Sequence, residues 1–169
     1  MNTIVYTSNT GTTKEYAKLL SDKLSLPYYS LDEIEHKVKP GGKIIYLGWI
    51  MASGVKGYKK VVKNYDVRAV CAVGMGATGT QVKEVRTKNK IPSSIPIFTL
   101  QGGFDVKKLH GIYKIMMTIM VKTAGKGLAN KQDRTQEEDQ MLEMMLHGGK
   151  YVDEKNLKAI LDWYGKRGE

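Results

Sequence analysis

The segment Tyr6-Thr7-Ser8-Asn9-Thr10-Gly11-Thr12-Thr13 decides the fold of this chain. It lies between a short apolar run, residues 3–6, and a helical pattern that starts at Lys14. Ser and Thr hydroxyl groups and one glycine therefore crowd a turn that leads from a strand into a helix. At a helix N-terminus the backbone N–H groups are unpaired and the helix dipole attracts negative charge. The segment predicts a phosphate-binding loop; the alternative is an ordinary Ser/Thr cap of a helix.

Apolar runs and helical patterns alternate along the first hundred residues. Two of the runs, around residues 44–47 and 70–73, are almost continuously apolar, as in central parallel strands that are covered on both faces. The alternation predicts an α/β fold, with a doubly wound, five-stranded parallel sheet. The expected strands are 3–7, 26–30, 43–49, 67–74 and 95–101, and the expected helices between them are 13–25, 57–65 and 79–88.

Length, composition and cysteine content favour one globular domain, residues 1–169. The chain has 169 residues, 41% of them hydrophobic, which is enough for a core of its own. Its start leads directly into the first apolar run, so we expect no signal peptide, and no apolar stretch is long enough to span a membrane. The single cysteine, Cys71, lies in an apolar run, and we expect a buried thiol in a cytoplasmic protein.

The net charge favours anionic partners. Lys and Arg number 27 against 17 acidic residues, which gives a formal charge of +10. Such a balance suits acidic proteins, nucleic acid or anionic lipid. The lysines are scattered from Lys14 to Lys166 with few aromatic residues between them, so nucleic acid is the least favoured of the three.

The region 104–151 interrupts the alternation and is expected to form a helical insertion. A helix is predicted over 107–124, a basic loop over 125–133, and a second helix after the capping box of Thr135 and Glu138. Most of the methionines fall in these two helices, and methionine-rich faces are adaptable. The two helices therefore either pack on each other or present a surface to a partner or an anionic membrane. A final helix, with Asp153 as its cap, is expected to pack on the sheet.

Ligands of open parallel sheets bind beyond the carboxyl ends of the strands. The segment 48–54 supplies Trp49 and Met51, which suit the cover of a flat aromatic ring, although Trp49 is as readily a core residue. The segment 74–79 matches G-x-G-x-x-G, but it follows the fourth strand and 91–101 contains no acidic residue. We interpret it as a glycine-rich loop that faces a ligand, and not as a nicotinamide site.

Other chemistries have little support in the sequence. The three histidines, His36, His110 and His147, are far apart and have no neighbours of metal-ligand type, so no metal site is expected. No catalytic acid, base or nucleophile is predicted either. An enzyme built from this chain would take its chemistry from a bound cofactor.

Two segments resemble the flavodoxin family. Ser8-Asn9-Thr10-Gly11-Thr12-Thr13 is similar to the flavodoxin phosphate loop, approximately [ST]-x-T-G-x-T, and it follows the first strand as that loop does. Residues 100–105, followed by 112–117, resemble the flavodoxin-like branch that includes menaquinone-dependent protoporphyrinogen dehydrogenase, which carries a long helical insertion after the fifth strand. The resemblance implies strand order 2-1-3-4-5, the insertion at 104–151, and FMN as the cofactor.

The resemblance also assigns residues to FMN. The phosphate would be held by Ser8, Asn9, Thr10, Gly11, Thr12 and Thr13. One side of the isoalloxazine ring would be lined by Trp49, Ile50, Met51, Ala52 and Ser53. The other side would be lined by Gly74, Met75, Gly76, Ala77, Thr78 and Gly79, and the edge closed by Gln101, Gly102 and Gly103.

The function that the resemblance implies is that of an FMN-dependent oxidoreductase. Its flavin would pass electrons to or from a quinone or a porphyrinogen-type substrate, with a redox partner protein or a small molecule as acceptor. The alternatives are a non-catalytic electron carrier and a flavin-free interaction module on the same fold. Short-chain flavodoxins are strongly acidic and this chain is basic, so different docking partners are expected, including peripheral contact with an anionic membrane.

Overall fold

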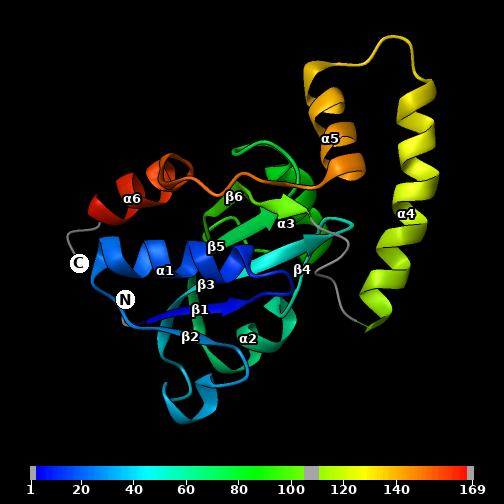
Figure 1. Cartoon of the computed structure of the whole chain (residues 1–169). Helices are drawn as coiled ribbons and strands as arrows, with labels where there is room; N and C mark the ends of the chain where they lie inside the picture. Colours follow the sequence, from blue (N-terminus) through cyan, green and yellow to red (C-terminus); the bar gives the residue numbers. More distant parts are fainter. Residues whose placement is uncertain (1–2, 105–110, 167–169) are drawn as a thin grey trace.

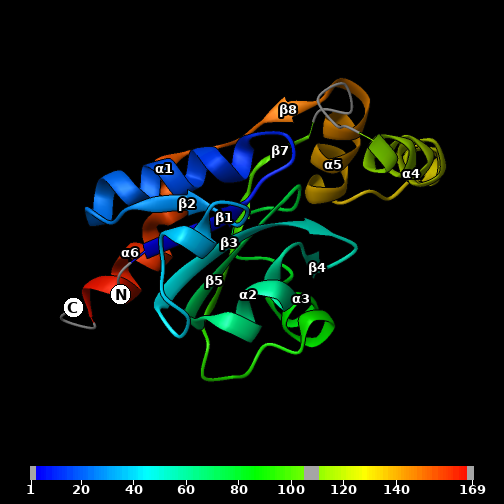
Figure 2. The ribbon, with the colours of Figure 1, turned by 90° about the horizontal axis from the view of Figure 1, so that it is seen from below.

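The computed structural model describes residues 3–104 and 111–166, and its centre is a mostly parallel sheet between two layers of helices (Figures 1 and 2). Five strands run parallel in the order β2-β1-β3-β5-β6. The prediction of an α/β fold with a parallel central sheet is confirmed. The parallel strands are β1 (Thr3–Thr7), β2 (Tyr28–Ser30), β3 (Lys43–Met51), β5 (Asp66–Gly74) and β6 (Ile97–Gln101).

Helices cover both faces of the sheet. The central strands are therefore almost continuously apolar in sequence. Along β3, Ile44 and Tyr46 point into one core, while Ile45 and Leu47 point into the other. The first core lies under α2 (Tyr58–Asn64) and α3 (Val82–Asn89), and the second under α1 (Thr12–Leu24) and α6 (Lys158–Gly165) (Figure 2). The short helix η1 (Ile34–His36) follows β2.

The third strand is longer than predicted and turns back on itself. β3 continues to Met51 and pairs antiparallel with β4 (Gly54–Val55), so the central sheet has six strands. The segment 48–54, predicted as a ligand-facing loop, is therefore largely a β-hairpin. Its tip is formed by Ala52 and Ser53, which both have a positive φ.

Two helices form the insertion, α4 (Gly111–Asn130) and α5 (Gln136–His147). The prediction of a basic loop over 125–133 is wrong for residues 125–130, because α4 continues to Asn130 through both of its later glycines. The predicted start of this helix, residues 107–110, lies outside the described residues. Figure 1 shows the pair projecting from one end of the sheet, with α4 as the outer helix.

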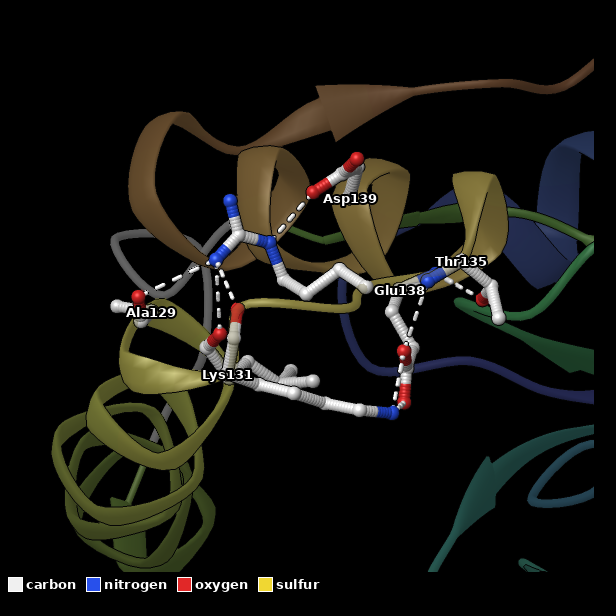
Figure 3. A network of polar contacts seen from close by, with 7 residues as sticks. Ala129, Lys131, Thr135, Glu138 and Asp139 are labelled. Carbon is white, nitrogen blue, oxygen red and sulfur yellow. Dashed lines mark hydrogen bonds and ion pairs between the residues drawn. The ribbon is translucent and has the colours of Figure 1, made fainter.

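The connection between α4 and α5 is held by side chains that satisfy helix ends (Figure 3). The Arg134 guanidinium donates to the carbonyls of Leu128, Ala129 and Lys131 at 3.1, 3.2 and 2.9 Å. These carbonyls lie at the C-terminus of α4, where no N–H group of the helix can reach them. The capping box of Thr135 and Glu138 is confirmed at the start of α5.

A small two-stranded antiparallel sheet joins the two ends of the insertion. β7 (Gly103–Phe104) pairs antiparallel with β8 (Gly149–Lys150), so the chain leaves the sheet and returns to it at one place. This second sheet was not predicted. The chain then forms a 3-10 turn, η3 (Glu154–Leu157), before α6; Asp153 caps this turn by accepting a hydrogen bond from the Lys155 N–H at 2.8 Å.

Two further expectations concern burial and membrane insertion. Cys71 is fully buried, as predicted, and burial raises the pKa of its thiol well above the ordinary value. None of the helices described here combines the length and the apolar character that crossing a bilayer demands.

Candidate functional site

A cavity of about 260 Å³ lies beyond the carboxyl ends of β1, β3 and β5. This is the edge of a parallel sheet at which ligands bind. All of its lining residues are uncharged. They are Asn9, Thr10, Thr12, Trp49, Ile50, Met51, Ala52, Ser53, Val73, Gly74, Met75, Gly76, Gln81, Gly103 and Met120.

The start of α1 borders this cavity and has no side-chain cap. Gly11 stands at the N-cap position with φ 98, a left-handed conformation that suits glycine, and its N–H donates to Ser8 Oγ at 3.1 Å. The Ser8 hydroxyl thus accepts a hydrogen bond within the loop, while Thr10 and Thr12 line the cavity. The alternative of an ordinary Ser/Thr cap is wrong, and the helix end is free to attract an anion.

Thr13, in the first turn of α1, carries a buried hydroxyl without a described partner. Thr13 is only 1% exposed. Within the described residues, its buried Oγ1 has no hydrogen-bond partner. Leaving a buried hydroxyl unpaired costs about 1–3 kcal/mol. Phosphate oxygens accept hydrogen bonds, so a phosphate group at the start of α1 fits this hydroxyl and the unpaired helix end together.

Trp49 forms part of one wall of the cavity. It is half-buried and belongs to neither core, and the ammonium group of Lys56 lies 5.6 Å from the centre of its ring. Of the two interpretations of Trp49 from the sequence, a ligand cover and a core residue, its position agrees with the first.

The same wall ends in a strained turn that α3 holds in place. Ala52 and Ser53 have φ values of 47 and 60, where Asn-Gly is the usual pair in a two-residue hairpin. The Asn89 side chain bridges the turn: its amide nitrogen donates to the Ser53 carbonyl, and its oxygen accepts from the Val55 N–H, both at 2.8 Å. Asn89 therefore fixes the position of this wall relative to α3.

The opposite wall is the loop after β5. Gly74, Met75 and Gly76 line the cavity, whereas Thr78 and Gly79 turn toward β6. The Gly79 N–H donates to the Thr99 carbonyl at 3.1 Å, and the Gln101 N–H donates to Thr78 Oγ1 at 2.9 Å. The second half of the G-x-G-x-x-G segment thus anchors the loop, while the first half faces the cavity.

A family model described as "Flavodoxin domain" matches residues 3–130, from the start of β1 to the end of α4. The chain belongs to the flavodoxin domain family. This membership supports a flavin-binding function of the electron-carrier type. Neither a curated protein nor a solved structure is matched by this flavodoxin domain.

The predicted cofactor residues divide into two groups in this flavodoxin domain. Those that line the cavity are Asn9, Thr10, Thr12, Trp49, Ile50, Met51, Ala52, Ser53, Gly74, Met75, Gly76 and Gly103. The others do not line it, and their contact with a cofactor stays a prediction: Ser8, Gly11, Thr13, Ala77, Thr78, Gly79, Gln101 and Gly102.

Packing accounts for Gly102 without any ligand. Its N–H donates to the Gly74 carbonyl and its carbonyl accepts from the Tyr151 N–H, both at 2.8 Å. A Cβ at this position would lie 2.6 Å from Val73 Cγ1. Gln101 instead lines a smaller neighbouring cavity together with Gln140 of α5.

Sequence reasoning missed Val73, Gln81 and Met120 as lining residues of the cavity; Val73 stands in β5, directly before the predicted glycine-rich loop. Gln81 directly precedes α3 and has φ 60, so its position follows from a turn that no local motif announces. Met120 reaches the cavity from α4, which requires the tertiary placement of the insertion. Its membership in the methionine-rich group was the only available signal.

The hydroxyl of Tyr16 ties the flavodoxin sheet to the chain that returns from the insertion. It donates to the Gln101 carbonyl at 2.5 Å and accepts from Asn156 Nδ2 at 2.6 Å. Burial raises the pKa of this hydroxyl, which stays protonated and able to donate. One side chain of α1 thereby holds both the end of β6 and the start of η3.

Replacing Ser53 by glycine is expected to stabilise the protein by about 0.5–1 kcal/mol, because glycine relieves the left-handed strain at the hairpin tip. Ser94→Gly is the matched control: Ser94 is exposed in a loop, and its φ is not positive. That change lowers stability slightly, since glycine widens the unfolded ensemble. Urea unfolding measures both variants, and equal effects would contradict the strain.

Tyr16→Phe is expected to lower the free energy of unfolding by about 2 kcal/mol, because the buried partners of the hydroxyl lose their hydrogen bonds. Tyr58→Phe is the control, since Tyr58 is buried and its hydroxyl forms no hydrogen bond within the described part of the chain. Its cost should stay below about 0.5 kcal/mol. Thermal unfolding followed by circular dichroism compares the two, and similar losses would argue against the role of Tyr16.

Proposed function

We propose that this flavodoxin domain is an FMN-dependent oxidoreductase. The observation that carries the proposal is the uncapped start of α1, with the unpaired Thr13 hydroxyl, beside an uncharged cavity at the carboxyl ends of the strands. The phosphate of FMN would bind at the loop, and its ring would lie between the β3–β4 hairpin and the loop after β5.

The residues of this chain would bind, orient and shield the cofactor. Hydroxyl and backbone N–H groups of the loop suit the phosphate, while Trp49, Met51 and Met75 provide apolar surface that excludes water from the ring. Because no lining residue is charged, the electronics of the ring would depend on backbone dipoles and on uncharged polar side chains. When bound, FMN supplies the transfer of one or two electrons.

Turnover of a small-molecule substrate distinguishes an enzyme from a carrier. We propose a quinone or a porphyrinogen-type molecule as the substrate, in line with the resemblance of residues 100–105 and 112–117 to the protoporphyrinogen dehydrogenase branch. A carrier on the same fold would hold a reducible flavin and show no turnover of either compound by the isolated protein. A flavin-free module would be colourless when purified and would not quench the fluorescence of added FMN.

The double variant Thr10→Glu, Thr12→Glu is expected to weaken FMN binding about 100-fold, because two carboxylates would repel the phosphate. Quenching of FMN fluorescence during titration gives the dissociation constant. The control carries the same changes at exposed threonines away from the cavity, Thr87→Glu and Thr123→Glu, and should bind FMN as the unaltered protein does. Unchanged affinity in the first variant would refute the phosphate site.

We further propose that α4 makes a peripheral contact with an anionic membrane. Ile115 and Ile119 lie one turn apart on this helix and are 63% and 57% exposed. The helix contains Lys114, Lys122 and Lys126 and no acidic residue in its sequence. It is also the outer helix of the insertion (Figure 2). Exposed apolar residues beside lysines are typical of a helix that lies in the interface of anionic lipids.

Sedimentation with lipid vesicles tests this contact. The protein is expected to bind phosphatidylcholine vesicles that contain phosphatidylglycerol, and to lose this binding in high salt. Ile115→Glu with Ile119→Glu should reduce the bound fraction about tenfold. Val62→Glu, at an exposed apolar residue of α2, is the control and should not. Salt-insensitive binding, or none, would remove the membrane from the proposal.

A further inference from the structure

A second cavity adjoins the phosphate loop on the side away from the predicted ring site. It has a volume of about 330 Å³ and lies between the carboxyl ends of β1 and β2. Since β1 stands between β2 and β3 in the sheet, the two cavities flank the end of β1. Asn9 lines both of them. A ligand whose phosphate binds at the start of α1 would therefore lie at their junction.

One cation and one carboxylate line the second cavity, and neither forms an ion pair within the described residues. Lys14, in the first turn of α1, is exposed and forms no ion pair within residues 3–104 and 111–166. Asp32 follows β2 and is exposed, and in the same part of the chain it forms no hydrogen bond or ion pair. Both groups are thus available to a ligand.

The neighbouring carboxylate is already engaged. Glu33 accepts hydrogen bonds from the Ser30 hydroxyl at 2.6 Å and from the Ser30 N–H at 3.1 Å. These bonds lower the pKa of Glu33, and the positive charge of Lys14 adds to the effect. Glu33 does not line the cavity, so Asp32 is its one acidic lining residue among the described residues, and Asp32 accepts no described hydrogen bond.

The position of Asp32 matches that of an acidic residue that binds ribose in other parallel sheets. It follows Gly11 of the phosphate loop by 21 residues and stands at the end of the next strand, β2. In dinucleotide-binding βαβ units, an acidic residue about 20 positions after the glycines accepts hydrogen bonds from ribose hydroxyls. A cavity of this volume also lies within the range of small-molecule sites, about 300–1,000 Å³.

We propose that the second cavity binds a ribonucleoside phosphate, with Lys14 against the phosphate and Asp32 against the ribose hydroxyls. Two sources share this chemistry. One is the adenylate half of FAD, whose flavin half would occupy the first cavity; this source rests on the proposed function. The other is a free nucleotide, such as AMP, that binds beside FMN and does not depend on a covalent link between the two.

Calorimetric titration of the flavin-free protein with FMN, FAD and AMP tests the proposal. If FAD is the source, it binds about tenfold tighter than FMN, and Asp32→Ala removes this preference while FMN affinity changes less than about twofold. If a free nucleotide is the source, AMP binds with and without FMN present, and Asp32→Ala and Lys14→Ala each weaken AMP about five- to tenfold. Asp133→Ala and Lys83→Ala, at exposed residues outside both cavities, are the controls.

The outcomes separate this proposal from the flavin site. Binding of FMN with no preference for FAD, and with no AMP binding that depends on Asp32, overturns the second cavity and leaves the flavin site intact. Binding of AMP that Asp32→Ala weakens, without binding of either flavin, supports the second cavity and refutes the proposed function. Equal affinities of the Asp32→Ala variant and the unaltered protein for FAD and for AMP overturn the proposal whatever their size.

Discussion

One buried hydroxyl, that of Tyr16, joins three parts of the chain that are far apart in sequence. It connects α1, which follows the loop of residues 8–11, to the end of β6 and to the segment before α6. The parallel strands place their carboxyl ends at one edge, but that edge becomes a shaped cavity only when the loops after the strands are fixed. Tyr16, Asn89 and Thr99 provide those connections from α1, α3 and β6. Partly buried hydrogen bonds of this kind favour a single arrangement of the elements that they join.

The fold class could be predicted because a parallel strand that is covered on both faces has an unbroken apolar sequence, such as residues 44–47. The exceptions have physical causes. The β3–β4 hairpin escaped prediction because its tip uses Ala52 and Ser53 where Asn or Gly is usual. The end of α4 was predicted as a loop because Gly125 and Gly127 disfavour helix, a preference that the Arg134 interactions with its last carbonyls offset.

The loop between β1 and α1 could be located from the sequence because its signal is local: hydroxyls and a glycine between a strand and a helix. Its binding of a phosphate stays a prediction. The walls were located only approximately, from the rule that strand ends hold ligands. Nothing local distinguishes Gly76, which lines the cavity, from Gly79, which donates to Thr99. Met120 enters the wall through the docking of α4, and such long-range placement leaves no periodic signal in the sequence.

The pairing of β7 with β8 makes the helical arm a module with adjacent ends. Phe104 and Gly149 are cross-strand partners, so the chain leaves the main domain and returns to it on two neighbouring strands. The arm between them is therefore free to change in length, or to shrink to a tight turn, without altering the register of the main sheet. Removal of the arm would take Met120 from the lining of the cavity and leave its other lining residues in place. A paired base of this kind lets the helical arm be exchanged while the residues of the other cavity walls, on the main sheet and its loops, keep their positions.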